Sequence, residues 1–264
     1  MRKLATGLVA ALLVVAGVSC DGDDGGGSRD LSNVLLTAAE TADEAGTARM
    51  EMTTEISVGG QDVTLAAEGE FDFANDVGRM TMSAAGGAGM PGVGKMETIL
   101  DGRYVYVKGA AFEAALDGEE WGRIDLTAAG AAGANQFNQD PTQYLEWLRG
   151  AGADVEKVGE EEIDGTTTTH YKADIPIDAI VEQAPDDATA DALRSGFAVF
   201  GDVESFPVQV WVDDEDLPRR ISVLLAGEGA TQLSSKITMD LFDYGVEVDV
   251  QPPDSYKDID NLGG

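Results

Sequence analysis

The side chains of residues 48–58 alternate between apolar and polar, and this period of two constrains the fold more than any other feature. Even positions carry Ala, Met, Met, Thr, Ile and Val, whereas odd positions carry Arg, Glu, Thr, Glu and Ser. Successive side chains of a β-strand point to opposite faces, so the pattern predicts a strand with one apolar and one solvated face. Such strands are typical of antiparallel sheets that are covered on one side only.

The same period recurs along most of the chain, interrupted by short turn signals. Gly59-Gly60, Asn75-Asp76, Asp101-Gly102 and Asp164-Gly165 each stand between two alternating stretches. Two-residue turns of this kind join neighbouring antiparallel strands. We therefore expect an antiparallel, meandering sheet, whose further strands cover residues 63–73, 79–83, 96–100, 104–108, 155–163, 166–175, 208–212, 220–225, 232–242 and 246–250.

Four segments have helical spacing of apolar residues or signals for a helix start. They are residues 31–45, with Asp30 as the N-cap, and residues 141–149, 176–184 and 187–197. Helices that are separate from a run of strands predict an α+β fold.

The only cysteine of the chain, Cys20, follows a basic start and an apolar stretch. Arg2 and Lys3 precede residues 4–18, which carry no charge, and Ser19 comes directly before Cys20. This order is typical of an export signal. It also resembles a bacterial lipobox, whose cysteine takes a diacylglycerol group as a thioether and becomes the new N-terminus. We expect residues 1–19 to be a signal peptide and Cys20 to be acylated.

Gly17 stands where a lipobox usually carries Leu, so two alternatives stay open. One is plain secretory cleavage after Ala16 or Val18, and the other is an uncleaved anchor. Residues 21–30 are rich in Gly and Asp and contain no apolar residue, which is typical of a flexible tether. We expect residues 20–30 to form the acylated tether and residues 31–264 to form a single domain.

Acidic residues dominate the composition. The chain has 49 Asp and Glu against 17 Lys and Arg, a formal charge of −32, and loss of Arg2 and Lys3 with the signal would bring it to −34. Nucleic acids and anionic lipid surfaces repel such a chain, so we expect no nucleic-acid partner. Attachment to a membrane would rest on the acyl group rather than on basic side chains.

The sequence carries no recognisable catalytic or metal-binding motif. It has no Gly-x-Ser-x-Gly elbow, phosphate loop or histidine-based metal motif, and we interpret His170 as an ordinary strand histidine. An EF-hand beginning at Asp21 fails, because Gly25 and Ser32 stand at ligand positions. The acidic residues 213–216 are interpreted as an exposed hairpin turn. An Asp–Glu pair that acts on a sugar stays an open alternative, but nothing selects one pair, so we expect neither an enzyme nor a cofactor.

Methionines gather on the apolar face of the predicted strands. Met50, Met52, Met80, Met82 and Met96 stand at alternating positions of neighbouring strands. This unbranched side chain suits a surface that accepts ligands of irregular shape, and it also fills ordinary cores. The residues alone leave open whether this face is a packed core or a cavity.

Several stretches resemble the actinobacterial LppX/LprAFG lipoproteins, which are relatives of the lipoprotein carrier LolA. The sequence Val210-Trp211-Val212-Asp213, followed by Leu217-Pro218-Arg219-Arg220-Ile221, looks like the strand–turn–strand of that family. Residues 101–106 resemble its early hairpin, and residues 165–171 its middle strand pair. Phe242-Asp243-Tyr244-Gly245 resembles the closing strand. The resemblance extends over residues 31–260, and the Gly-rich residues 85–94 have no counterpart in it.

The resemblance implies a strongly curved antiparallel sheet, like an unclosed β-barrel, with helices packed on its concave side. Between them it implies an apolar cavity for acyl chains, and so favours a cavity over a core. The implied partners are a lipid or glycolipid, the membrane and a membrane transporter, and the implied location is the outer face of the cell membrane. The side chains that we expect to line the cavity are Met50, Met52, Ile56, Leu65, Phe71, Phe73, Met80, Met82, Met96, Leu145, Leu148, Ile180, Leu193, Phe197, Val210 and Met239.

Two functions of different classes fit these expectations. The first is an anchored carrier that takes an acylated molecule out of the membrane and shields its chains from water. The second is a sensor that detects envelope lipids and regulates a membrane partner without carrying anything. The carrier needs no catalytic group, which agrees with the lack of a recognisable catalytic motif in the sequence.

The lipobox interpretation predicts that Cys20→Ala releases the protein from the membrane or leaves an uncleaved precursor, because no thiol remains to be acylated. Membrane fractionation, with mass spectrometry of the N-terminal peptide, measures both outcomes. A correctly cleaved Ala variant that stays in the membrane fraction would contradict acylation.

Overall fold

The computed structural model describes residues 28–84, 94–126, 154–184, 186–227 and 233–259. The helices in this part are α1 (Ser28–Ala45), α2 (Glu113–Leu116), α5 (Ile177–Glu182) and α6 (Asp187–Ala198). The strands are β1 (Thr47–Val58), β2 (Gln61–Asp72), β3 (Val77–Ala84), β4 (Met96–Asp101), β5 (Tyr104–Gly109), β6 (Gly122–Asp125), β7 (Val155–Ile163), β8 (Thr166–Pro176), β9 (Ser205–Asp213), β10 (Pro218–Ala226), β11 (Ser234–Phe242) and β12 (Lys257–Asp258).

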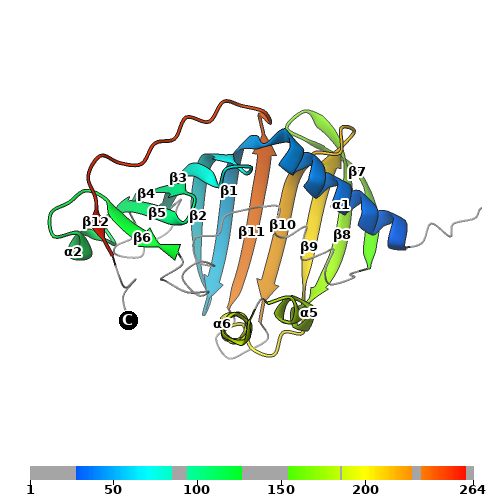
Figure 1. The fold of residues 1–264 in the computed structure, drawn as a ribbon. Coiled ribbons are helices and arrows are strands. Elements are labelled where there is room, and N and C mark those ends of the chain that lie inside the picture. Colours follow the sequence, from blue (N-terminus) through cyan, green and yellow to red (C-terminus); the bar gives the residue numbers. More distant parts are fainter. Residues whose placement is uncertain (1–27, 85–93, 127–153, 185, 228–232, 260–264) are drawn as a thin grey trace, which may run out of the picture.

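These strands form one sheet that consists of two meanders meeting at β1. The order is β12-β6-β5-β4-β3-β2-β1-β11-β10-β9-β8-β7, so β1 pairs with both β2 and the distant β11. Every described pair is antiparallel except the short β12–β6 pair. The sheet is curved, and β12 and β7 lie at its two open edges (Figure 1). The predicted α+β fold, with an antiparallel and meandering sheet, is confirmed.

Helices α1, α5 and α6 contribute side chains to one face of this sheet. α1 crosses the half of the sheet that contains β7–β10, whereas α5 and α6 lie at one end of these strands (Figure 1). Leu35 of α1, Ile180 of α5 and Ala190 of α6 are buried in one cluster with strand residues. The three helices were predicted, although α1 already begins at Ser28, so Asp30 lies in its first turn rather than before it. The predicted helix at residues 141–149 lies outside the described residues.

No helix of the described segments is both long and apolar enough to span a membrane.

Two predicted hairpins have the backbone that a tight β-turn requires. Gly59 and Gly60 connect β1 to β2 with φ angles of 57° and 81°, and Asp164 and Gly165 connect β7 to β8 with 47° and 84°. Two consecutive positive φ angles match the twist of the flanking strands, and glycine and aspartate tolerate them best. These turns set the register of both hairpins.

The predicted strand at residues 246–250 is wrong. This segment has no strand pairing, although Val246, Val248 and Val250 are half-buried and their neighbours Glu247 and Asp249 are exposed. The alternation therefore comes from an extended segment whose valines point inward. This segment forms no hydrogen-bonded ladder with a neighbouring described strand, so it is not a β-strand. The chain instead runs on to β12, which pairs with β6. The sequence prediction missed both of these short strands and α2.

The buried side chains form two clusters on the same face of the sheet. The main cluster lies under α1, α5 and α6 and includes Met50, Val210 and Ile221. The second cluster is smaller and consists of Val105, Val107 and Ile124, with Ile259 packed against it. Leu100 and Val105 follow Phe71 and Gly78 in cross-strand register, which places both clusters on one face.

A glycine in β2 tests how closely β2 and β3 approach each other. A Cβ at Gly69 would collide with the carbonyl oxygen of Arg79, whereas a Cβ at Gly159 of β7 would meet no atom within 4 Å. We expect Gly69→Ala to lower the free energy of unfolding by about 1–3 kcal/mol, because backbone cannot yield as a flexible side chain would. Urea denaturation measures this change. Gly159→Ala is the matched control and should leave stability nearly unchanged; equal losses in both variants would contradict the close approach.

Candidate functional site

A continuous row of apolar side chains crosses eight neighbouring strands on the face that carries the helices, here called the apolar face. Each residue stands directly opposite the next in the strand register. The row consists of Met96, Met82, Ala67, Met52, Met239, Ile221, Val210 and Tyr171. A parallel row of smaller side chains lies beside it: Ala84, Leu65, Thr54, Ile237, Val223, Val208, Ala173 and Val155. The two rows explain why the strands alternate, because every second residue belongs to this face.

Burial changes along the first row. Ile221 and Val210 are 0% and 1% exposed, whereas Met52 and Met82 are only half-buried. Along this row, the positions on β8–β11 are therefore a packed core, whereas Met52, Met82 and Met96 on β1, β3 and β4 keep apolar surface accessible. The methionines occupy the transition between the two.

The residues predicted to line a cavity divide in the same way. Six of them are buried in the main cluster, namely Met50, Phe71, Met80, Ile180, Val210 and Met239. Five are half-buried and pack against it, namely Met52, Phe73, Met82, Leu193 and Phe197. Ile56, Leu65 and Met96 are half-buried on the same face but are not part of that cluster. Leu145 and Leu148 lie outside the described residues.

An open apolar pocket of about 510 Å³ lies between α6 and the end of β10. Its walls are formed by Ala192, Leu193, Ser195, Gly196, Phe197, Phe200 and Leu225. Phe197 also stacks on Phe206 of β9, with ring centroids 5.7 Å apart, which joins this pocket to the main cluster. The helical spacing of Leu193 and Phe197 predicted their place, but Phe200 and Leu225 come from other segments and were missed. A pocket of this size without a charged wall residue suits a hydrocarbon chain.

The opposite face of the sheet, here called the outer face, is polar. Asp240, Glu51 and Glu68 stand side by side across β11, β1 and β2. Two hollows of about 330 Å³ each lie on this face and share Glu51, Glu68 and Thr81 as walls. Hydrocarbon would meet carboxylates there, so the candidate apolar site is confined to the other face. In the described segments, no group of three or more His, Cys, Asp or Glu is arranged to hold a metal ion.

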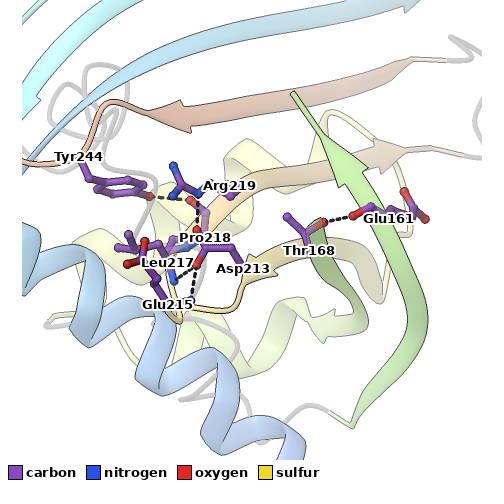
Figure 2. Close-up of polar contacts among 8 residues, drawn as sticks. All are labelled: Glu161, Thr168, Asp213, Glu215, Leu217, Pro218, Arg219 and Tyr244. Carbon is purple, nitrogen blue, oxygen red and sulfur yellow. Dashed lines mark hydrogen bonds and ion pairs between the residues drawn. The ribbon is translucent and has the colours of Figure 1, made fainter. Parts of the chain in front are cut away.

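The turn between β9 and β10 is organised by Asp213. Its carboxylate accepts hydrogen bonds from the backbone N–H groups of Glu215 and Leu217, both at 2.9 Å, and from Nε of Arg219 at 2.5 Å (Figure 2). The Asp213 side chain is 1% exposed. The structure thus confirms the predicted turn, but Asp213 is buried within it.

Tyr244 connects this turn to the end of β11. Its hydroxyl donates a hydrogen bond to the carbonyl oxygen of Pro218 at 2.6 Å (Figure 2), and the Arg219 guanidinium lies 5.4 Å from the centre of its ring. Burial raises the pKa of Tyr244 well above its usual value, so the hydroxyl stays protonated and can donate. Two stretches on which the family resemblance rests therefore contact each other and serve the fold rather than the pocket.

Comparisons with known proteins agree with this architecture. No protein-family model matches the chain. A Streptomyces coelicolor protein, whose name describes it as a lipoprotein, is 28% identical over 84% of this chain and 72% of its own length. Lipoprotein LprA of Mycobacterium tuberculosis is 23% identical over 94% of this chain and 95% of its own length. The crystal structure of the M. tuberculosis lipoprotein LppX superposes with a TM-score of 0.56 and 15% identity, covering 85% of this chain and all of LppX.

In sequence and fold, the chain is similar to the actinobacterial LppX/LprAFG lipoproteins. The large, curved and unclosed sheet of LppX/LprAFG proteins, expected from the resemblance, is confirmed by LppX at the level of the fold. The names of these relatives describe them as lipoproteins.

The Asp213 turn predicts a stability defect without a ligand-binding defect. Asp213→Ala leaves the Arg219 guanidinium, whose side chain is 20% exposed, without its partner. We expect a loss of about 3–5 kcal/mol in the free energy of unfolding, because a largely buried ion pair is broken on one side. Urea denaturation measures this loss, and exposed Asp214→Ala is the control. A calcium-dependent loss of ligand binding by the Asp213 variant would contradict a purely structural turn.

Proposed function

We propose that this protein binds lipids or acylated glycolipids on its apolar face and carries or shields them in the cell envelope. The observation that carries the proposal is the row of methionines, which stays half-buried on β1–β4 next to a packed core. An ordinary core would bury these side chains completely.

The energetics favour acyl chains as the ligand. Each methylene that leaves water contributes about 0.8 kcal/mol, so a two-chain lipid can be held without a specific polar contact. The apolar pocket beside α6 and the accessible half of the apolar face offer such an environment. Methionine adapts its shape by rotation about three bonds, which suits chains that differ in length and branching.

A binding role needs no catalytic residue, and we propose that the protein is not an enzyme. It would work on the outer face of the cell membrane, held by lipid on Cys20. A membrane transporter that delivers or receives the ligand would complete the cycle. The acidic chain, with its net charge of −32, supports anchoring by an acyl group because anionic headgroups would repel the protein itself.

Lipid binding can be tested on protein that lacks the anchor. We expect the domain purified from residue 28 onward to retain lipid, detected by native mass spectrometry and by solvent extraction. Met82→Trp should be tolerated by the half-buried site and should lower lipid loading, because the indole occupies space meant for the ligand. A packed core would instead lose about 1–3 kcal/mol from overpacking.

The matched control is Ser83→Trp, which places the same side chain on the exposed outer face of the same strand. Its lipid loading should equal that of the unchanged domain. A domain that is free of lipid, and that Met82→Trp destabilises, would show that the fold is retained but the carrier function is not.

A further inference from the structure

His170 lies buried on the outer face of β8, away from the apolar face. It is 6% exposed, and its ring stacks on Trp211 of β9 with centroids 4.1 Å apart and an interplanar angle of 11°. The carboxylate of Glu161 of β7 bonds to the edges of both rings: it lies 2.9 Å from His170 Nδ1 and accepts a hydrogen bond from Trp211 Nε1 at 2.9 Å. The three residues therefore join three neighbouring strands.

Both nitrogens of the His170 ring face oxygen atoms. Nδ1 lies 2.9 Å from Oε1 of Glu161, and Nε2 lies 3.0 Å from Oε1 of Gln209. Only the imidazolium ion can donate to two acceptors at once. A neutral ring would keep one donor and turn a lone pair toward the other oxygen, which is unfavourable in a buried site.

The Gln209 amide can also form a hydrogen bond with the neutral His170 ring. Rotation of the amide by half a turn exchanges its oxygen for its NH₂ group, which can donate to a neutral Nε2. The network thus has two satisfied arrangements, one for each protonation state of the ring. In the charged arrangement the Glu161–His170 hydrogen bond is charge-assisted on both sides, so it is the stronger of the two.

The surrounding charges keep Glu161 ionised while the ring changes state. Hydrogen bonds from Trp211 and then from His170 lower the pKa of Glu161, and Arg220 of β10 adds to the effect. Arg220 is itself paired with Asp240 of β11, at 2.8 Å between Nη2 and Oδ2. Asp164 in the β7–β8 turn is the other acid close enough to act on Arg220.

The strand that this network holds is an edge strand. β7 pairs only with β8 among the described strands, and its register shifts between Lys157 and Gly159. Thr168 Oγ1 of β8 donates a hydrogen bond to the backbone oxygen of Glu161 at 2.8 Å (Figure 2). Glu161 is thus bonded to β8 through its backbone as well as its side chain. On the other side of the sheet, α1 contacts β7, and Val155 of β7 belongs to the main cluster.

We propose that His170 is a proton-operated latch: its protonated ring ties β7 to β9 through Glu161 and Gln209, and its deprotonation turns the Gln209 amide and loosens β7 beneath α1. The latch is independent of any ligand. The attachment of β7 is therefore tighter when the ring carries its second proton, that is, at more acidic pH.

Nuclear magnetic resonance tests the coupled amide directly, because His170 is the only histidine of the chain. In a pH series, the side-chain NH₂ signals of Gln209 should move with the same midpoint as the ring signals of His170. Gln209 signals that stay constant while His170 titrates would overturn the proposal.

Hydrogen exchange tests the loosening of β7. After correction for intrinsic rates, backbone amides of β7 should exchange more slowly at pH 5 than at pH 8, because the charge-assisted bond is the stronger one. Glu161→Gln should abolish this difference, whereas Glu162→Gln, the same charge change one residue further along β7, should keep it. Loss of the difference in both variants, or its persistence in Glu161→Gln, would overturn the latch.

Discussion

The pairing of β1 with both β2 and β11 is the constraint on which the rest of the structure depends. It joins the first long strand to the last, so two meanders become one sheet with a common apolar face. Met52 then stands between Ala67 and Met239, and the apolar row runs through it without interruption. Without this junction, the half of the sheet under α1 and the half with the second cluster would be separate sheets with no common apolar face.

The sheet separates an apolar face from a polar, charged face. The apolar face carries methionines, branched residues and the pocket beside α6, whereas the outer face carries paired charges and the Glu161–His170–Trp211 network. A ligand on the apolar face cannot touch the outer network, and protons at His170 cannot reach the ligand. Any influence between the two must therefore pass through the strands themselves, and β7, which contacts α1, carries Glu161 of the network.

Local patterns predicted most of the fold because the long strands carry their own signals. Residues 48–58 alternate, and Gly59-Gly60 supplies the turn that returns the chain. The short strand β12 has two residues, and Arg123 bonds to Asp258 across 135 positions, so no local pattern indicates that pairing. The candidate site shows the same limit. Helical spacing indicated Leu193 and Phe197, but Leu225 of β10 reaches the pocket only through the tertiary fold.

The choice of side chains along the apolar row follows from what each half of the sheet has to do. Ile221 and Val210 are branched and stiff, and they are buried where helices cover the strands. Met52 and Met82 are unbranched, and they stand where burial becomes partial. Branched side chains at these positions would form a rigid surface that fits one ligand shape. Methionine side chains can rotate to contact either each other or a bound ligand. Along one sheet, the row thus changes from stiff, buried side chains to flexible, half-buried ones, as the proposed binding of lipids requires.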